Sequence, residues 1–96
     1  MRVISRKKLS EIWSRNPELE KPLRTWIKVA EGADWYDFSD VRGTITQVDR
    51  VGEFFVFDIL GNRYRLICCI SFEKGKVYVR DVLTHAEYDR EHWKRD

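Results

Sequence analysis

Two hydrophobic periodicities divide the chain into a helical N-terminal third and a β-rich remainder. Between residues 7 and 31, apolar side chains recur every three or four positions, which is the spacing of one helix face. The repeating positions are Leu9, Ile12 and Trp13 in a first helix over residues 7–15, and Leu23, Trp26, Ile27 and Ala30 in a second helix. The second helix follows Asn16-Pro17 and ends at Gly32. Because an interior proline loses a backbone hydrogen bond, this helix either begins near Pro22 or kinks there.

From Thr44 onward, the pattern changes to short β-rich runs separated by turn signals. The runs cover residues 45–51, 54–60, 63–72 and 76–83, and the turns fall at Gly52, Gly61-Asn62 and Lys74-Gly75. Connections this short favour antiparallel neighbours. The sequence therefore predicts an α+β fold, with the two N-terminal helices packed on one face of a mainly antiparallel sheet. Residues 33–43 show no clear period and are expected to form a partly packed connection.

The stretch YVRDVLTHAEYD, residues 78–89, marks a change from strand to a short C-terminal helix. Thr84 and Glu87 have the S/T-x-x-E spacing of a capping box, and Leu83 and Tyr88 occupy the positions of a hydrophobic staple. His85 is then the first helical residue, where backbone N–H groups favour an anion. Two interpretations stay open. The motif is only a helix start, or it is also a phosphate site with His85 and Tyr88 as neighbours on the helix surface.

Arginines on two predicted strands extend this candidate site. Alternation along residues 63–72 assigns one face to the core, with Tyr64, Leu66, Cys68, Ile70 and Phe72. Arg63 and Arg65 then project from the face that the helices leave uncovered. Arg80 shares a face with Tyr78 and Val82, but the register that would bring it beside Arg65 is not written in the sequence. Matching faces would suit phosphodiester cleavage, which needs cations for developing negative charge and nearby proton donors. Solvated arginines on an exposed face are the alternative.

Composition limits the classes of protein. A chain of 96 residues is expected to form one domain, residues 1–96, and 43% hydrophobic with 14% aromatic residues supply a core. The formal net charge of +2 does not by itself indicate nucleic-acid binding. No apolar stretch approaches the roughly 20 residues of a membrane span, and no signal-peptide core is seen, so we expect a cytoplasmic protein without membrane contact.

The sequence gives little indication of a metal site or of a reactive thiol. Cys68 and Cys69 are neighbours, so they point to opposite faces of a strand and are expected to stay reduced. There is no CxxC pair, and the HAE of residues 85–87 lacks the downstream PCxxC of zinc deaminases. We therefore expect no metal and no other cofactor.

Two segments resemble one known family. VFDILGNRYRLICCISF, residues 56–72, and VYVRDVLTHAEYDREHWK, residues 77–94, resemble the HigB toxins of bacterial type II toxin–antitoxin systems, and GNRYRLI and THAEYD are the specific part. The resemblance implies a RelE-like fold and an mRNA interferase that cuts translated message on the ribosome without a metal, by attack of the ribose 2′-hydroxyl. It also implies a HigA-like antitoxin with a helix-turn-helix domain, and contact with operator DNA only through the antitoxin complex.

Site residues are carried over on the same motifs. By this resemblance, Arg65 and Arg80 hold the scissile phosphate, and His85 gives a proton to the leaving 5′-oxygen. Tyr88 orients the 2′-hydroxyl or stacks on a base. Glu87 is a candidate base, although the capping box competes for it.

Peripheral polar residues are interpreted as ordinary solvated groups by default, and in a ribosome-bound toxin they are the candidates for contact with RNA phosphates. They are Asn62, Arg63, Lys74, Lys76, Lys94 and Arg95. Asn62 is expected mainly to supply turn geometry, and His92 is expected to be a surface residue.

Two other functions remain open. The chain could block translation by occupying RNA or the ribosome without chemistry. It could also be a structural partner whose exposed aromatics Trp35, Tyr36 and Phe38 form a docking surface.

Overall fold

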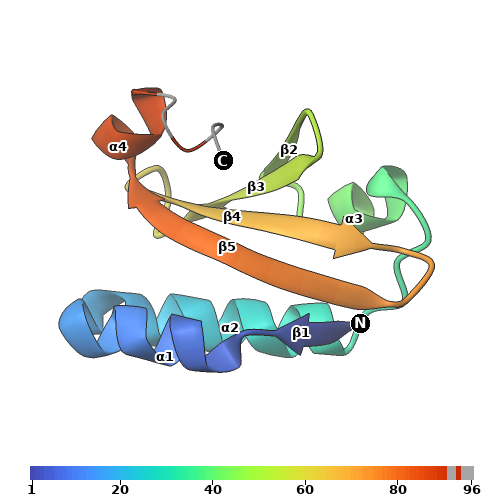
Figure 1. Ribbon diagram of the computed structural model, residues 1–96, viewed down its shortest axis with the longest axis horizontal. Coiled ribbons are helices and arrows are strands. Elements are labelled where there is room, and N and C mark those ends of the chain that lie inside the picture. The colour runs from blue at the N-terminus through green and yellow to red at the C-terminus, as the bar shows by residue number, and fades with distance from the viewer. Residues whose placement is uncertain (91–92, 94–96) are drawn as a thin grey trace.

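A computed structural model places a five-stranded sheet between a pair of long helices and a short C-terminal helix (Figure 1). The structure describes residues 1–90 and residue 93. The helices are α1 (Arg6–Arg15), α2 (Glu20–Glu31), α3 (Phe38–Thr44) and α4 (His85–Asp89), with a 3₁₀ turn η1 (Pro17–Leu19) between α1 and α2. The strands are β1 (Arg2–Ile4), β2 (Val48–Val51), β3 (Phe54–Ile59), β4 (Tyr64–Ser71) and β5 (Lys76–Thr84). The predicted α+β class is confirmed.

The sheet has the strand order β1-β5-β4-β3-β2. β2 to β5 form the predicted antiparallel meander. β1 adds at the other edge and runs parallel to β5, with Val3 opposite Val77. No strand was expected there, because three residues are too few to show an alternation.

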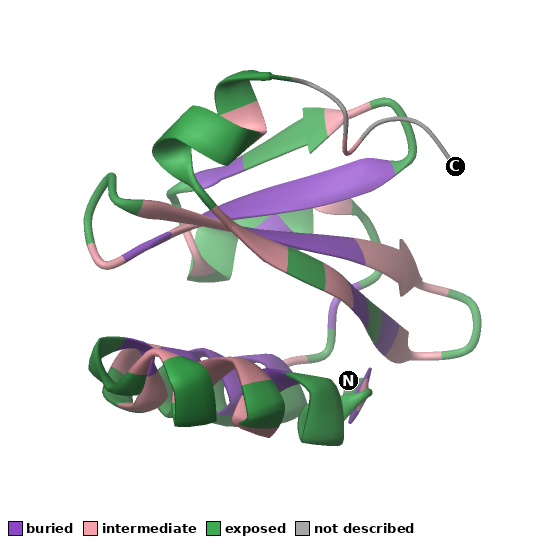
Figure 2. Cartoon of the chain, turned by 60° about the vertical axis from the view of Figure 1, so that its left-hand side comes forward, coloured by how far each residue is buried: buried purple, intermediate pink, exposed green. Residues whose placement is uncertain are grey.

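The helix pair covers one face of this sheet, as predicted. The helix surfaces that face the strands are buried, and the opposite surfaces are exposed (Figure 2). Phe57, at the centre of β3, is fully buried, and its ring meets Trp26 of α2 edge-on, with centroids 5.4 Å apart. Pro22 lies in the first turn of α2, where a backbone N–H has no helical partner in any case. Its predicted place near the helix start is therefore confirmed.

Residues 33–43 are partly packed, as predicted, but the expectation of an irregular connection is wrong, because most of α3 lies there. Asp37 caps this helix by accepting a hydrogen bond from the Asp40 backbone N–H at 2.9 Å. Trp35 is buried, and its Nε1–H donates to Thr44 Oγ1 at 3.1 Å. Phe38 packs against the core, so Tyr36 alone of the three aromatics expected in a docking surface is well exposed. A helix this short, which includes Gly43, does not show its period in the sequence.

A β-bulge in β5 changes the faces of that strand. The pairing passes from Ile67–Asp81 to Cys68–Val79, so that Arg80 is the extra residue of the bulge. Val82 consequently joins Val77 and Val79 in the helix-side core. The prediction that Arg80 and Val82 share a face is therefore wrong.

A smaller apolar cluster lies on the other face of the sheet, which we call the outer face. Phe54, Val56 and Ile67 form its buried part. The residues packed around them are Val51, Cys69, Leu83, Tyr88 and Trp93. The two predicted staple positions, Leu83 and Tyr88, thus anchor α4 over the outer face.

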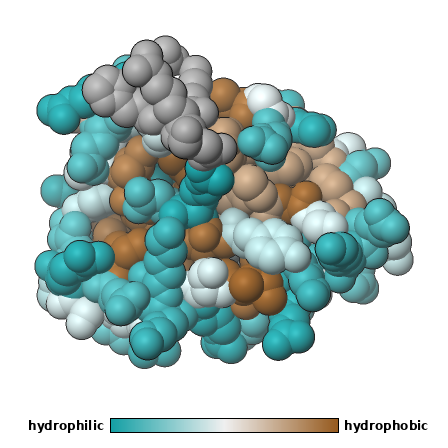
Figure 3. All heavy atoms as spheres, in the orientation of Figure 1, coloured by the Kyte–Doolittle hydropathy of each residue, from teal (hydrophilic) through white to brown (hydrophobic). Residues whose placement is uncertain are grey.

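The surface of the molecule is mixed in character. Figure 3 shows hydrophilic side chains around the margin of one face and hydrophobic atoms reaching the surface nearer its middle. In the described part of the chain, no helix has the length and apolar character needed to cross a membrane.

Candidate functional site

Arg65 and Arg80 lie on the same face of the sheet, at the two ends of a row of aromatic rings. The Arg65 guanidinium carbon is 5.5 Å from the Tyr88 ring centroid, and that of Arg80 is 5.2 Å from the Phe54 ring centroid. Trp93 joins the two rings: it stacks on Tyr88 at 5.0 Å and meets Phe54 edge-on at 5.5 Å. We call Tyr88, Trp93 and Phe54 the aromatic row. The register that the sequence left open thus brings both arginines to the outer face.

The Arg65 side chain is held tightly and is only 11% exposed. Its Nη2 donates to Asn62 Oδ1 at 2.6 Å, and its Nη1 donates to the backbone oxygens of Asn62 and Tyr64, each at 3.2 Å. Its Nε is 3.3 Å from Oδ1 of Asp58, the residue directly opposite on β3. Asn62 therefore contributes more than turn geometry, because it anchors this arginine.

The start of α4 is organised by the predicted capping box. Glu87 N–H donates to Thr84 Oγ1 at 3.2 Å, and Thr84 N–H donates to Glu87 Oε1 at 2.9 Å. His85 N–H continues the sheet pairing by donating to Arg63 O at 3.0 Å. Two of the first three backbone N–H groups of α4 are thus already bonded within the protein. The expectation that open N–H groups at His85 favour an anion is therefore not met at His85 itself.

The His85 side chain is exposed and oriented by a carboxylate of the same helix. Its Nδ1 lies 2.9 Å from Oδ2 of Asp89. A carboxylate on Nδ1 keeps the proton on that nitrogen and leaves Nε2 as the atom that can exchange protons with a substrate.

Arg63 does not share the surroundings of Arg65, so the prediction that both project from the uncovered face is wrong. Arg63 precedes β4, and its Nη1 lies 3.3 Å from Oε1 of Glu18 in η1. Tyr64 hydroxyl donates to Glu18 Oε2 at 2.7 Å and accepts from Asn16 Nδ2 at 3.1 Å. The hydrogen bond to Glu18 raises the pKa of Tyr64 above its usual value. These side chains fasten the turn before β4 to the helices.

The remaining predicted RNA contacts lie elsewhere. Lys74 and Lys76 belong to the turn and strand start at the opposite end of β5 from α4 (Figure 1). Lys94, Arg95 and His92 lie outside the described residues.

The two cysteines occupy opposite faces of the sheet, as predicted, and both are free thiols. Burial raises the pKa of Cys68 well above its usual value. Burial and the nearby Glu53 also raise the pKa of Cys69, while Arg80 lowers it. Both thiols are thus protonated at neutral pH and are poor nucleophiles.

Sequence reasoning missed three members of the site, Asp58, Phe54 and Trp93. Asp58 had a usable signal, because Asp58 and Arg65 lie equally far from the predicted Gly61-Asn62 turn. Phe54 and Trp93 gave none, since their neighbours depend on the sheet register and on the path of the chain after α4.

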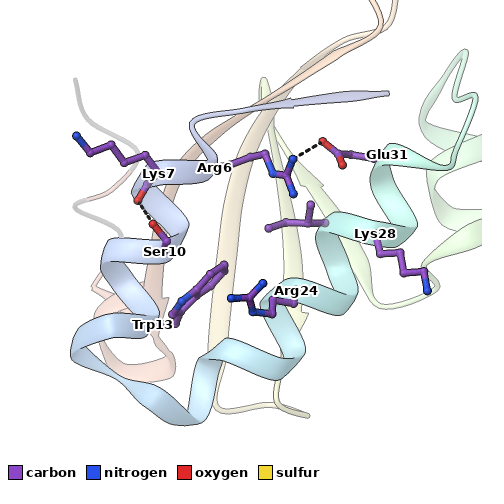
Figure 4. A pocket seen from close by; sticks show the side chains of 8 residues that line it. Arg6, Lys7, Ser10, Trp13, Arg24, Lys28 and Glu31 are labelled. Atoms are coloured by element: carbon purple, nitrogen blue, oxygen red, sulfur yellow. Dashed lines mark hydrogen bonds and ion pairs between the residues drawn. The ribbon is translucent and has the colours of Figure 1, made fainter.

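A groove lies between α1 and α2, and side chains that line it are shown in Figure 4. Arg6 lies 3.7 Å from Glu31, and Arg24 pairs with Glu20 at 2.7 Å while its guanidinium sits over the Trp13 ring. These cations are committed to contacts within the helix pair. The groove belongs to the helix layer, whereas the aromatic row belongs to the outer face.

No metal-binding cluster is present among residues 1–90 and Trp93, in the sense that no three His, Cys, Asp or Glu side chains gather there. That the reaction needs no metal stays a prediction.

Comparison with known proteins identifies similar sequences. The family model of the HigB toxin, described as the RelE-like toxic component of a toxin–antitoxin system, matches residues 19–91. The mRNA interferase toxin HigB of Escherichia coli strain K12 is 46% identical over 35 residues, and this match spans 36% of the present chain and 34% of that relative. The mRNA interferase HigB of Escherichia coli O6:H1 is 26% identical over 93 residues, or 94% of the present chain and 90% of that relative.

Proposed function

The chain belongs to the HigB family of RelE-like toxins of toxin–antitoxin systems, and from this premise we propose that it is an endoribonuclease that cuts mRNA on the ribosome. One observation carries the proposal. Two arginines and Tyr88 lie along the aromatic row of the outer face, and the exposed His85 lies on the same short helix as Tyr88. Cations beside a proton donor are the groups that phosphodiester cleavage requires.

The proposed reaction is attack of a ribose 2′-hydroxyl on the adjacent phosphate. The 2′-hydroxyl gives its proton to a base, for which Glu87 is the candidate, as the O2′–P bond forms. The P–O5′ bond breaks, and protonation of the leaving oxygen gives a cyclic phosphate and a 5′-hydroxyl. Arg80 offsets the negative charge that develops on the phosphoryl oxygens. His85 donates a proton from Nε2 to the leaving 5′-oxygen, and Asp89 on Nδ1 orients the ring. No metal is required.

Tyr88 acts in this scheme through its hydroxyl, which orients the attacking 2′-hydroxyl. Its ring already contacts Trp93 and Arg65, so stacking on a base is the less favoured role. Glu87 is a candidate base only if its carboxylate gives up the hydrogen bond that it accepts from the Thr84 N–H.

Partners follow from the family. We propose a HigA-like antitoxin with a helix-turn-helix domain, contact with operator DNA only through that complex, and action on the ribosome in the cytoplasm. The peripheral cations Arg63, Lys74 and Lys76 lie away from the aromatic row and would contact ribosomal RNA phosphates. Lys94 and Arg95 are proposed to do the same.

A test of this function is mapping of mRNA 5′-ends in cells that briefly express the chain. The wild type should create new ends within translated frames, whereas His85→Gln and Arg80→Met should create few or none. Lys28→Met removes an exposed cation of α2 and serves as the matched control, with wild-type cleavage. Equal cleavage by all four chains would overturn the site.

The second candidate is a translation inhibitor that binds without chemistry. It is favoured by the fact that Arg65 and two backbone N–H groups at the start of α4 are already bonded within the protein. Growth arrest by the wild type without new message ends would establish this alternative.

A further inference from the structure

Asp58 is the one charged residue in a strand that is otherwise apolar. β3 reads FFVFDI, and all its other side chains are buried. Asp58 points to the outer face with Phe54 and Val56, since strand side chains alternate. A carboxylate placed there loses part of its hydration, and the guanidinium of Arg65 compensates it.

The N–H groups along the edges of the Arg65 guanidinium are bonded to neighbouring protein groups. Asp58, Asn62 and the Tyr64 carbonyl engage all three nitrogen atoms. A phosphate is bound through these N–H edges, in the forked arrangement typical of arginine. With its nitrogen atoms engaged in this way, the Arg65 guanidinium carbon lies over the Tyr88 ring, 5.5 Å from the ring centroid. Arg65 would therefore act on the reaction indirectly, through its contact with Tyr88.

Tyr88 is held by contacts on its ring and on its backbone. Trp93 stacks on the ring with an interplanar angle of 17°, and Trp93 Nε1–H donates to the Tyr88 carbonyl at 2.9 Å. Arg65 is one of the contacts between this ring and the sheet, together with the apolar cluster of the outer face against which Tyr88 packs. Asp58 fixes Arg65 from the neighbouring strand. A shift of Arg65 would thus move the Tyr88 hydroxyl.

We propose that Asp58 is a positioning residue, which clamps Arg65 against Tyr88 and so places the Tyr88 hydroxyl for the cleavage reaction. The inference rests on the ribonuclease activity proposed above. It assigns Arg65 a supporting role in place of direct phosphate binding.

The first test measures single-turnover cleavage of message on programmed ribosomes. Asp58→Asn keeps the size of the side chain and removes its charge, and should lower the rate roughly 10- to 100-fold, as a displaced reacting group does. The ribosome concentration at half-maximal rate should stay unchanged. Asp58→Glu retains the charge and should recover part of the rate. Asp49→Asn changes an exposed acid of β2 and should cleave like the wild type.

A double variant tests whether Asp58 acts through Tyr88. In a Tyr88→Phe background, which lacks the hydroxyl, Asp58→Asn should cause little further loss, because both changes remove the same effect. A fully additive loss would overturn the proposal, as would a wild-type rate for Asp58→Asn alone.

A second readout separates this proposal from the proposed function. In NMR spectra of tyrosine-labelled protein, Asp58→Asn should shift the Tyr88 ring resonances, and Asp49→Asn should leave them in place. Unchanged Tyr88 resonances in a folded Asp58→Asn chain would overturn the positioning role even in an active enzyme. If the wild type cuts no message but Asp58→Asn still shifts the Tyr88 resonances, the ribonuclease function is refuted and the clamp is kept. If Asp58→Asn fails to fold, Asn62→Ala removes another Arg65 anchor and serves in its place, with the same expected results.

Discussion

The two faces of the sheet bury aromatic rings in different surroundings. On the helix-covered face, Phe57 is fully buried and meets Trp26 of α2. On the outer face, Phe54 and Tyr88 lie beneath the guanidinium groups of Arg80 and Arg65. The first arrangement excludes water and stabilises the fold. The second holds two cations against aromatic rings, with Arg65 largely buried and bonded within the protein and Arg80 proposed to meet the phosphate.

The largest effect should come from comparing one ring on each face. Phe57→Ala should lower the free energy of unfolding by about 5 kcal/mol, and Phe54→Ala by nearer 3 kcal/mol, because the outer cluster can relax toward solvent. Urea denaturation measures both. Phe54→Ala should also reduce cleavage under conditions where the protein stays folded, since Arg80 loses the ring over which its guanidinium lies. Equal destabilisation by the two changes would contradict the division between core and site.

A substitution at Arg80 should lower activity and leave stability nearly unchanged. Arg80→Met should lower the cleavage rate by roughly 100- to 1,000-fold, the scale of losing one donor to a developing oxyanion. Thermal unfolding should change little, because the apolar part of the side chain is kept. A large drop in melting temperature with cleavage retained would make Arg80 a structural residue.

Arg63 provides the contrast to Arg80. Its exposed pair with Glu18 is worth about 1 kcal/mol or less, so Arg63→Ala should barely alter stability. Cleavage on saturating ribosomes should persist, and only the salt dependence of ribosome binding should weaken. Loss of the cleavage step itself in this variant would show that the helix side of the turn takes part in the chemistry.

The cap of α4 tests how far the site depends on a local helix start. Thr84→Ala should cost about 1 kcal/mol. Amide exchange should speed up at Glu87, whose N–H bonds to the Thr84 hydroxyl. Cleavage should fall with it, because His85 and Tyr88 both lie on α4. Thr44→Ala is the control: it makes the same substitution at the end of α3, where the hydroxyl accepts a hydrogen bond from Trp35, and cleavage should survive it.

The smallest effect concerns Cys69. Its raised pKa keeps the thiolate scarce at pH 8, and Arg80 partly opposes this rise. Arg80→Met should therefore raise the pKa further and slow alkylation of Cys69 at a given pH. Mass spectrometry across a pH series measures the change. Faster alkylation would indicate that the bulge does not hold Arg80 near this thiol.

Much of this contrast between faces could be predicted from local pattern. The alternation along β4 assigned Leu66 and Cys68 to the core correctly, and the spacing of Thr84 and Glu87 predicted the capping box that the structure contains. Both are properties of neighbouring residues, which a sequence displays directly.

The rest depended on pairing between distant segments. The bulge at Arg80 arises from the β4–β5 register, so simple alternation assigned Val82 to the wrong face. α3 was missed because it is short and includes Gly43, and Trp35 was expected at the surface for the same reason. Arg63 was placed with Arg65 because the predicted strand began one residue too early.

The central claim is that the outer face, with its two arginines and His85, forms a nuclease site. The most direct measurement incubates purified protein with ribosomes translating a defined message and determines the position and chemistry of the ends produced. Wild type should cut within the reading frame and leave 5′-hydroxyl ends, and His85→Gln and Arg80→Met should leave the message intact. Intact message with wild type, or equal cutting by both variants, would contradict it.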